Sequence, residues 1–367
     1  MRCFQRMQCL HRFVGTIVPM DSDIVNLLIG TYASDGAEPG SGEGIWRVTL
    51  DRRSGALSGD HLITTTTAPS FLALHPSGNM LYAVQETEQG QVSAFSVQGE
   101  NLLLQATVPT GGSFPCHLLA FNDALWVANY GDGVVSRLDL NDDGEPTGMP
   151  AVYRNSGSGP NSERQEGPHA HFVHDTGNGS VWVSDLGTDE IRRFTVSGPD
   201  GLAAVLPPAT GPRHQAALPG GAVVVVGELD SRLHVLASDG SGSILSSVAA
   251  LATPVPSGQP SQPSHIDVGV SPATRNLLYA ATRGPDVLAV FAVEDGQTLR
   301  HLSDSPIGGA WPRHFAVVPD SDDGADLIVA ANQYSSTLDV LRVDGVGHVE
   351  QVYSLALPVP ACVIPAD

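Results

Sequence analysis

The feature that most constrains this chain is an internal repeat that recurs roughly every 50 residues. Each unit opens with a proline or a histidine and a short alternating run. A turn rich in Pro, Gly, Asp or Asn follows, then an apolar run and a second alternating run. The units begin at Pro69, Pro115, His169, Pro212, Pro263 and Pro312. This order and period are typical of the four-stranded blades of a β-propeller.

A seventh blade is divided between the two ends of the chain. Residues 26–32 match a middle strand and residues 44–51 match a third strand, but no inner strand precedes them. The segment "PACVI" from Pro360 matches the inner-strand starts "PCHLL" and "PRHFA". We therefore predict an all-β fold, a seven-bladed β-propeller of four-stranded blades in which the C-terminal strand completes the first blade. A β-sandwich or two small β domains would be the alternative, but the repeats are regular and no linker separates two halves.

Residues 20–367 are assigned to this propeller, and residues 1–19 are interpreted as a disordered tail or a start-site artefact. The longest apolar stretch of residues 1–19 is too short for a signal peptide or a membrane span, and no other segment is apolar for 18 residues. We expect no membrane association. The four cysteines are too few and too scattered for a disulfide scaffold, so reduced thiols and a cytoplasmic location are expected.

The charge balance excludes several functions. A net charge of −21 argues against nucleic-acid partners, which require a basic surface. The basic residues are all arginine, and the absence of lysine excludes Schiff-base and pyridoxal chemistry. No dinucleotide or phosphate-loop motif is present, and no cofactor is expected.

Polar side chains recur at two places in the repeats, and equivalent places in successive blades converge around one axis. The inner-strand starts carry His117, His169, His171, Arg213, His214, His265, Arg313 and His314. The middle-strand ends carry Glu86, Asn129, Asp185, Glu228, Arg283 and Asn332. They predict a polar site at the mouth of the central channel. Any single histidine of the group could instead join neighbouring blades by hydrogen bonds.

No metal site is predicted. The pair His169 and His171 could begin a zinc site, but no third ligand stands at a usual spacing. Oxygen ligands from Glu86, Asn129, Asp185 and Glu228 could bind calcium without any sequence motif, so that alternative stays open.

The ordered set of short motifs resembles a known family. The motifs are "IGTY", "GIW", "PSFLALHPSGNMLYAV", "PCHL", "VANYGDG", "HAH", "SDLGTDEI", "GPRH", "GEL", "TRG", "PRHF" and "AANQYS". In this order, and over nearly the whole chain after Met20, they resemble the lactonase seven-bladed β-propellers. That family includes the propeller type of 6-phosphogluconolactonase and the fungal carboxy-muconate cyclases. The chain departs from the family pattern near His265 and near Glu86, which leaves the substrate in doubt.

The resemblance implies a catalytic site made of a histidine of "HAH" with the arginine, glutamate and arginine of the next motifs. These residues are His169 or His171, Arg213, Glu228 and Arg283. The remaining residues proposed to bind substrate are Glu86, His117, Asn129, Asp185, His265, Arg313 and Asn332.

The function expected from these residues is hydrolysis of a sugar lactone, 6-phosphogluconolactone of the pentose phosphate pathway being favoured. Arg213 and Arg283 would hold the anionic group and stabilise the oxyanion, and Glu228 or His171 would act as general base on water. The expected partner is a small anionic lactone, and the expected state is a monomer or a weak homodimer. A muconate-type lactonizing cyclase or isomerase, and a non-catalytic propeller that binds a protein or a small ligand, are the alternatives.

Overall fold

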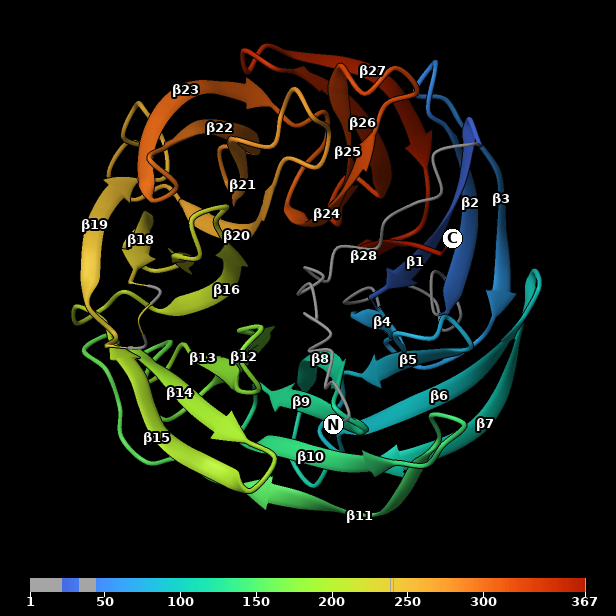
Figure 1. Cartoon of the computed structure of the whole chain (residues 1–367), viewed down its shortest axis with the longest axis vertical. Helices are drawn as coiled ribbons and strands as arrows, with labels where there is room; N and C mark the ends of the chain where they lie inside the picture. The colour runs from blue at the N-terminus through green and yellow to red at the C-terminus, as the bar shows by residue number, and fades with distance from the viewer. Residues whose placement is uncertain (1–21, 33–43, 238, 240, 367) are drawn as a thin grey trace, which may run out of the picture.

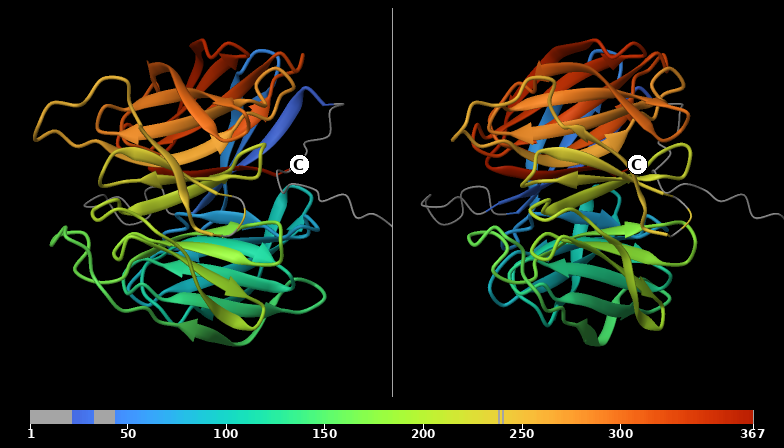
Figure 2. Two further views of the ribbon diagram at one scale, coloured as in Figure 1. Left: turned by 60° about the vertical axis from the view of Figure 1, so that its left-hand side comes forward. Right: turned by 90° about the vertical axis from the view of Figure 1, so that its left-hand side faces the viewer.

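The structure is a computed structural model that describes residues 22–32, 44–237, 239 and 241–366. Within these ranges every regular element is a β-strand, and 28 strands form seven antiparallel four-stranded sheets around a central axis (Figure 1). Figure 2 shows the same ring from the side, with the connections between strands leaving both faces. The predicted seven-bladed β-propeller is confirmed.

The strands of each blade are given from the axis outward. The first blade contains β28 (Pro360–Pro365), β1 (Ile24–Thr31), β2 (Ile45–Asp51) and β3 (Leu57–Thr64). The second contains β4 (Leu72–Leu74), β5 (Met80–Gln85), β6 (Gln91–Gln98) and β7 (Asn101–Pro109). The third contains β8 (Pro115–Phe121), β9 (Ala124–Asn129), β10 (Val135–Leu140) and β11 (Pro146–Tyr153). The fourth contains β12 (Ala170–Asp175), β13 (Val181–Asp185), β14 (Glu190–Thr195) and β15 (Gly198–Val205).

The last three blades follow the same order. The fifth contains β16 (Pro212–Ala217), β17 (Val223–Gly227), β18 (Arg232–Leu236) and β19 (Ile244–Ala249). The sixth contains β20 (Gln262–Val268), β21 (Leu277–Arg283), β22 (Val287–Glu294) and β23 (Thr298–Pro306). The seventh contains β24 (Pro312–Pro319), β25 (Ala325–Asn332), β26 (Thr337–Asp344) and β27 (Val349–Ala356).

The core lies between the blades. Every residue of the middle strands β9, β17 and β25 is buried, because each of these strands is covered by a neighbouring blade on both faces. The outermost strands, such as β7, are mostly exposed. The hydrophobic effect therefore holds blade against blade, and the inner strands meet at the axis.

The two ends of the chain close the ring inside one blade, as predicted. Strand β28 pairs with β1 in the register Ile29↔Val363. The side chains of Leu27, Ile29 and Val363 pack in one cluster with Val329 and Val340 of the seventh blade. Completion of the first blade and its contact with the last blade thus depend on the same six-residue strand.

The interpretation of residues 1–19 lies outside the described residues. In the part of the chain that the structure describes, no helix is long and apolar enough to cross a membrane. Cys116 and Cys362 are both buried free thiols.

Candidate active site at the mouth of the channel

A β-bulge at the start of the inner strands creates the first ring of site residues. In β8, β12, β20, β24 and β28 one residue is skipped in the ladder, and in β16 the register shifts at the same place. A bulge turns the unpaired side chain out of the normal alternation. The residues at this position are Ser70, Cys116, His171, Arg213, Ser264, Arg313 and Ala361. All of them except Ser264 line one small cavity of about 20 Å³.

The second ring follows the end of the middle strands. Its members are Tyr32, Glu86, Tyr130, Leu186, Glu228, Arg283 and Gln333. In four blades the residue before the inner-strand proline is a non-glycine with positive φ, for example Phe114 at 50° and Trp311 at 64°. The carbonyl groups of these two residues accept hydrogen bonds from the N–H groups of Tyr130 and Gln333. A repeated, strained turn therefore fixes where the second ring begins.

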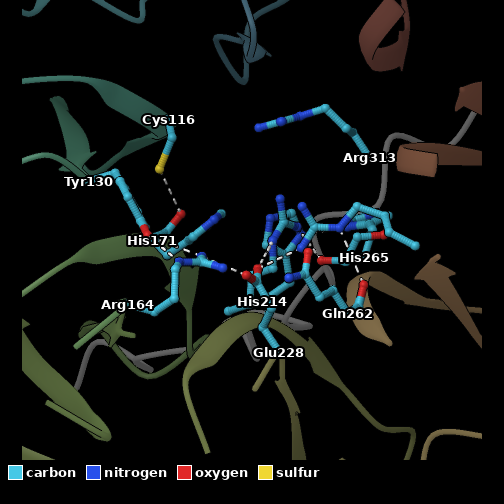
Figure 3. A network of polar contacts seen from close by, with 12 residues as sticks. Cys116, Tyr130, Arg164, His171, His214, Glu228, Gln262, His265 and Arg313 are labelled. Carbon is cyan, nitrogen blue, oxygen red and sulfur yellow. Dashed lines mark hydrogen bonds and ion pairs between the residues drawn. The ribbon is translucent and has the colours of Figure 1, made fainter. Parts of the chain in front are cut away.

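Glu228 forms ion pairs with three arginines, and Figure 3 shows it beside one of them, Arg164. Its Oε2 is 3.0 Å from Arg213 Nε and 2.7 Å from Arg283 Nη2, and its Oε1 accepts a 2.6 Å hydrogen bond from Arg164 Nη2. Burial alone would raise the pKa of the Glu228 carboxyl, but the arginines outweigh burial and hold that pKa well below its usual range. Glu228 is therefore a fixed anion that proton transfer does not reach at neutral pH.

Glu86 and Arg313 form the opposite wall. The Tyr32 hydroxyl donates to Glu86 Oε1 at 2.5 Å, and the Ser70 hydroxyl donates to Oε2. The Arg313 guanidinium lies 4.8 Å from the centre of the Tyr32 ring, and its Nη1 donates to Gln333 Oε1 at 3.2 Å. Among the described residues Arg313 has no carboxylate within ion-pair distance, so its charge is available to a ligand.

His171 has the one imidazole on the bulge ring. Its Nδ1 is buried and has no hydrogen-bond partner among the described residues, while its backbone carbonyl accepts from Cys116 Sγ at 3.4 Å. Burial, and next the charge of Arg213, hold the pKa of His171 well below its usual range. The ring is therefore neutral at pH 7, with one nitrogen able to accept a proton.

His169 points elsewhere. Its ring stacks on Tyr130 with centroids 4.5 Å apart, its Nδ1 lies 2.6 Å from the Tyr130 carbonyl oxygen, and its Nε2 lies 3.1 Å from Glu166 Oε1. Both ring nitrogens are occupied, and His169 does not line the cavity. Of the two histidines of "HAH", His171 is the one that lies with Arg213 and Arg313.

In six of the seven blades, the residue after the bulge position has a ring, and these rings form an aromatic plug under the cavity. Its rings belong to Phe71, His117, Phe172, His214, His265 and His314. Backbone N–H groups donate to Nδ1 of His117 and of His314, while the Nδ1 atoms of His214 and His265 lie 2.7 Å apart. His117 and His265, expected as substrate-binding residues, are thus packing residues of the channel.

The amides and the carboxylate at the middle-strand ends are inside the blades. Asn129, Asp185 and Asn332 are fully buried, one residue before the second ring. Asn129 Nδ2 donates to the Val134 carbonyl, Asn332 Nδ2 donates to Asp339, and Asp185 accepts from the His169 N–H. The structure places these three side chains inside the blades and not with the residues of the second ring, because side-chain direction reverses at each residue along a strand.

Sequence reasoning missed several residues of the mouth. Tyr32, Tyr130 and Gln333 could have been found by aligning the blades one position later than the conspicuous Asn residues. Arg164 lies in the connection between β11 and β12, outside the repeat, and no repeat signal identifies it.

The two walls together carry an excess of positive charge. Arg164, Arg213, Arg283 and Arg313 stand against two carboxylates, those of Glu86 and Glu228, which leaves two uncompensated positive charges. In a chain of net charge −21 this local reversal favours an anionic ligand. In the described ranges no group of three or more His, Cys, Asp or Glu residues is arranged to hold a metal ion.

Known proteins share this architecture. The family "Lactonase, 7-bladed beta-propeller" matches residues 26–365. A protein of Bacillus subtilis named 6-phosphogluconolactonase is 29% identical over 91% of this chain and 96% of its own length. A 6-phosphogluconolactonase of Formosa agariphila is 27% identical over 75% of this chain and 81% of its own length. The solved structure of the periplasmic gluconolactonase PpgL of Pseudomonas aeruginosa superposes with a TM-score of 0.80 at 25% identity, covering 93% of this chain and 99% of that one.

The fold and the site define a closed seven-bladed β-propeller whose channel mouth combines a neutral histidine with a cluster of arginines. The family match extends over nearly all of the described residues. The chain belongs to the family of seven-bladed β-propeller lactonases.

Proposed function

We propose that this chain is a lactonase that hydrolyses a sugar lactone with a negatively charged group, and that 6-phosphogluconolactone is its substrate. One observation carries the proposal. His171, with a free Nδ1, and Arg313, with no carboxylate partner, line the same cavity. The names of two relatives support the same reaction, and the positive mouth supports an anionic substrate.

The reaction begins with His171 Nδ1 as the general base. It takes a proton from a water molecule whose oxygen attacks the lactone carbonyl carbon. The carbonyl oxygen becomes an oxyanion that the guanidinium of Arg313 stabilises, with Arg213 beside it. Collapse of this intermediate breaks the ring C–O bond, and the departing oxygen takes the proton back from His171. The products are the open hydroxy acid and the regenerated imidazole.

Glu228 has a different role in this proposal. Both carboxylate oxygens of Glu228 are paired with arginines, whereas His171 Nδ1 has no hydrogen-bond partner among the described residues, so His171 rather than Glu228 is placed to take a proton from water. Glu228 instead holds Arg213 and Arg283 in place and offsets part of their charge.

The test is hydrolysis of freshly prepared 6-phosphoglucono-δ-lactone, measured against the spontaneous rate. We expect a wild-type rate well above background and a fall of about a hundredfold to ten-thousandfold in kcat for His171→Asn. This substitution breaks no side-chain hydrogen bond of Nδ1, so the fold should survive. His61→Asn on the outer strand β3 is the control and should behave as wild type. A wild-type rate equal to background removes this substrate and directs attention to muconate-type lactones.

Three further proposals rest on the family resemblance and on the sequence. They are a place in the pentose phosphate pathway, a cytoplasmic location, and a monomer or weak homodimer. Cell fractionation and sedimentation of the purified protein test the last two.

A further inference from the structure

The connection between β11 and β12 lies outside the repeat, and it places the side chain of Arg164 at the channel mouth. The connection is anchored by Gln165, whose side chain is fully buried. Gln165 Nε2 donates to the Leu186 carbonyl at 2.9 Å and to Asp189 Oδ1 at 2.8 Å, and its Oε1 accepts from the Asn161 N–H at 3.2 Å. The backbone next to Gln165 is therefore held firmly, and it carries Arg164.

Arg164 differs from the other two arginines of Glu228 in its exposure. The exposed fraction of its side chain is 32%, against 3% for Arg213 and 7% for Arg283. Arg213 and Arg283 both pair with Glu228 Oε2, so two buried cations remain with the carboxylate if Arg164 turns away. The Tyr130 hydroxyl lies 3.1 Å from Arg164 Nη2 and orients the guanidinium. Arg164 is thus the most exposed of the three arginines and the one placed to contact a ligand.

Arg164 also lines a second cleft, which has a volume of about 420 Å³. The cleft lies between the β11–β12 connection and the segment that leads into β20. Besides Arg164 and Glu228 its polar walls include Asn161, Glu163, Ser231, Gln259, Ser261 and Gln262. Arg164 is the one cation among the residues that line it.

The cleft adjoins the inner cavity at one ion pair. Glu228 lines the cleft, Arg213 lines the cavity, and these two side chains are 3.0 Å apart. A ligand that reaches from His171 to Arg164 would have to pass along this ion pair.

We propose that the outer cleft is the subsite for the end of the substrate remote from the lactone carbonyl, and that Arg164 binds the anionic group there. Amide and hydroxyl side chains of the walls suit the hydroxyl groups of a sugar. Arg164 then selects phosphorylated or carboxylated lactones over neutral ones. This inference rests on the proposed function, since it names the group by which that site chooses its substrate.

The test measures binding, so that it needs no turnover. Titration calorimetry compares 6-phosphogluconate, the open-chain product, with gluconate, which lacks the phosphate. We expect wild type to prefer the phosphorylated ligand and Arg164→Gln to lose about tenfold or more of that preference. Arg164→Lys keeps the charge and should retain part of it.

Arg154→Gln is the matched control. Arg154 belongs to the same connection between β11 and β12, its side chain is 70% exposed, and it does not line the cleft. This substitution should leave the preference for phosphate intact, whereas general damage to the connection would affect both variants alike. A preference that survives in Arg164→Gln, or an equal loss of both ligands, would overturn the inference.

The inference and the proposed reaction can fail separately. A wild type that hydrolyses no lactone but shows an Arg164-dependent preference for phosphate would refute the reaction and keep the subsite. Hydrolysis that depends on His171, with no effect of Arg164 on selectivity, would keep the reaction and refute the subsite.

Discussion

Glu228 shows how surroundings determine what a side chain can do. A glutamate at a channel mouth suggests a general base, yet this carboxylate is 1% exposed and contacts three guanidinium groups. Burying an ion pair costs free energy of desolvation. When one partner is removed, the other is left as an unpaired buried charge, which destabilises the folded protein. We therefore regard Glu228 as the residue that makes the arginine cluster possible.

The substitution Glu228→Gln tests this role at the scale of one residue. It leaves Arg213 and Arg283 buried without their carboxylate, and we expect the free energy of unfolding to fall by about 3–5 kcal/mol. Urea denaturation at pH 7 measures the change. Glu100→Gln is the control, because the Glu100 side chain is 80% exposed and its loss should change stability by about 0.5 kcal/mol or less. If the Glu228→Gln protein were as stable as wild type, Glu228 would not be the residue that stabilises the buried arginines.

At the scale of the element, the inner strand has two functions. Its bulged first residue faces the cavity, its next residue joins the aromatic plug, and its later residues pair with the middle strand. The same design recurs around the axis, so the identity of one residue per blade sets the chemistry of the mouth. Strand β28 has the added task of closing the ring.

Truncation after Pro358 tests the closure. It removes β28, exposes the inner edge of β1, and takes Cys362 and Val363 out of the core. Because an unpaired strand edge promotes aggregation, we expect the truncated protein to be insoluble or unfolded. Soluble yield and circular dichroism measure this, with deletion of Asp367 alone as the control. A soluble, native-like truncated protein would show that the ring closes without β28.

At the scale of the whole molecule, the buried histidines of the aromatic plug make the stability of the fold depend on pH. Burial first, and then neighbouring histidines or Arg213, hold the pKa values of His117, His214 and His265 well below the usual 6.5, and that of His314 falls to about 3. These histidines stay neutral in the folded protein but take up protons when it unfolds below pH 6.5. Each of them therefore lowers the free energy of unfolding by about 1.4 kcal/mol per pH unit below 6.5.

The prediction is a steady loss of stability from pH 6.5 downward, measured by urea denaturation. Burial raises the pKa of Asp267 to about 6 and also raises that of Asp185, and these two groups act in the opposite direction as the pH falls. They stand against the four histidines of the plug together with His171 and His174, whose pKa values burial also lowers. His314→Phe should reduce the slope of the free energy of unfolding against pH by the contribution of one histidine, about 1.4 kcal/mol per pH unit. Phenylalanine fits at this position because Phe71 and Phe172 occupy the equivalent positions in other blades. His61→Asn, on the exposed strand β3, should leave the slope unchanged. A flat stability profile between pH 6.5 and 4.5 would contradict the coupling.

The sequence by itself determined the number of blades, the split first blade and the convergence of His, Arg and Glu at one place. Those properties follow from local patterns, namely turn residues, apolar runs and their period. These patterns can be recognised in the sequence without knowing how the chain packs. The family resemblance also pointed to Arg213, Glu228 and Arg283 as a group with either His169 or His171.

Only the tertiary structure decided which neighbouring residue faces the channel and what it can do there. Asn129 and Tyr130 are adjacent in sequence, yet one is inside a blade and the other contacts Arg164, because side-chain direction reverses at each residue of a strand. The protonation of His171 and Glu228 depends on burial and on charges from other blades. Arg164 lies in the connection between β11 and β12, which is not part of the repeated sequence pattern. Packing and long-range charge decide such properties, and a local pattern does not contain them.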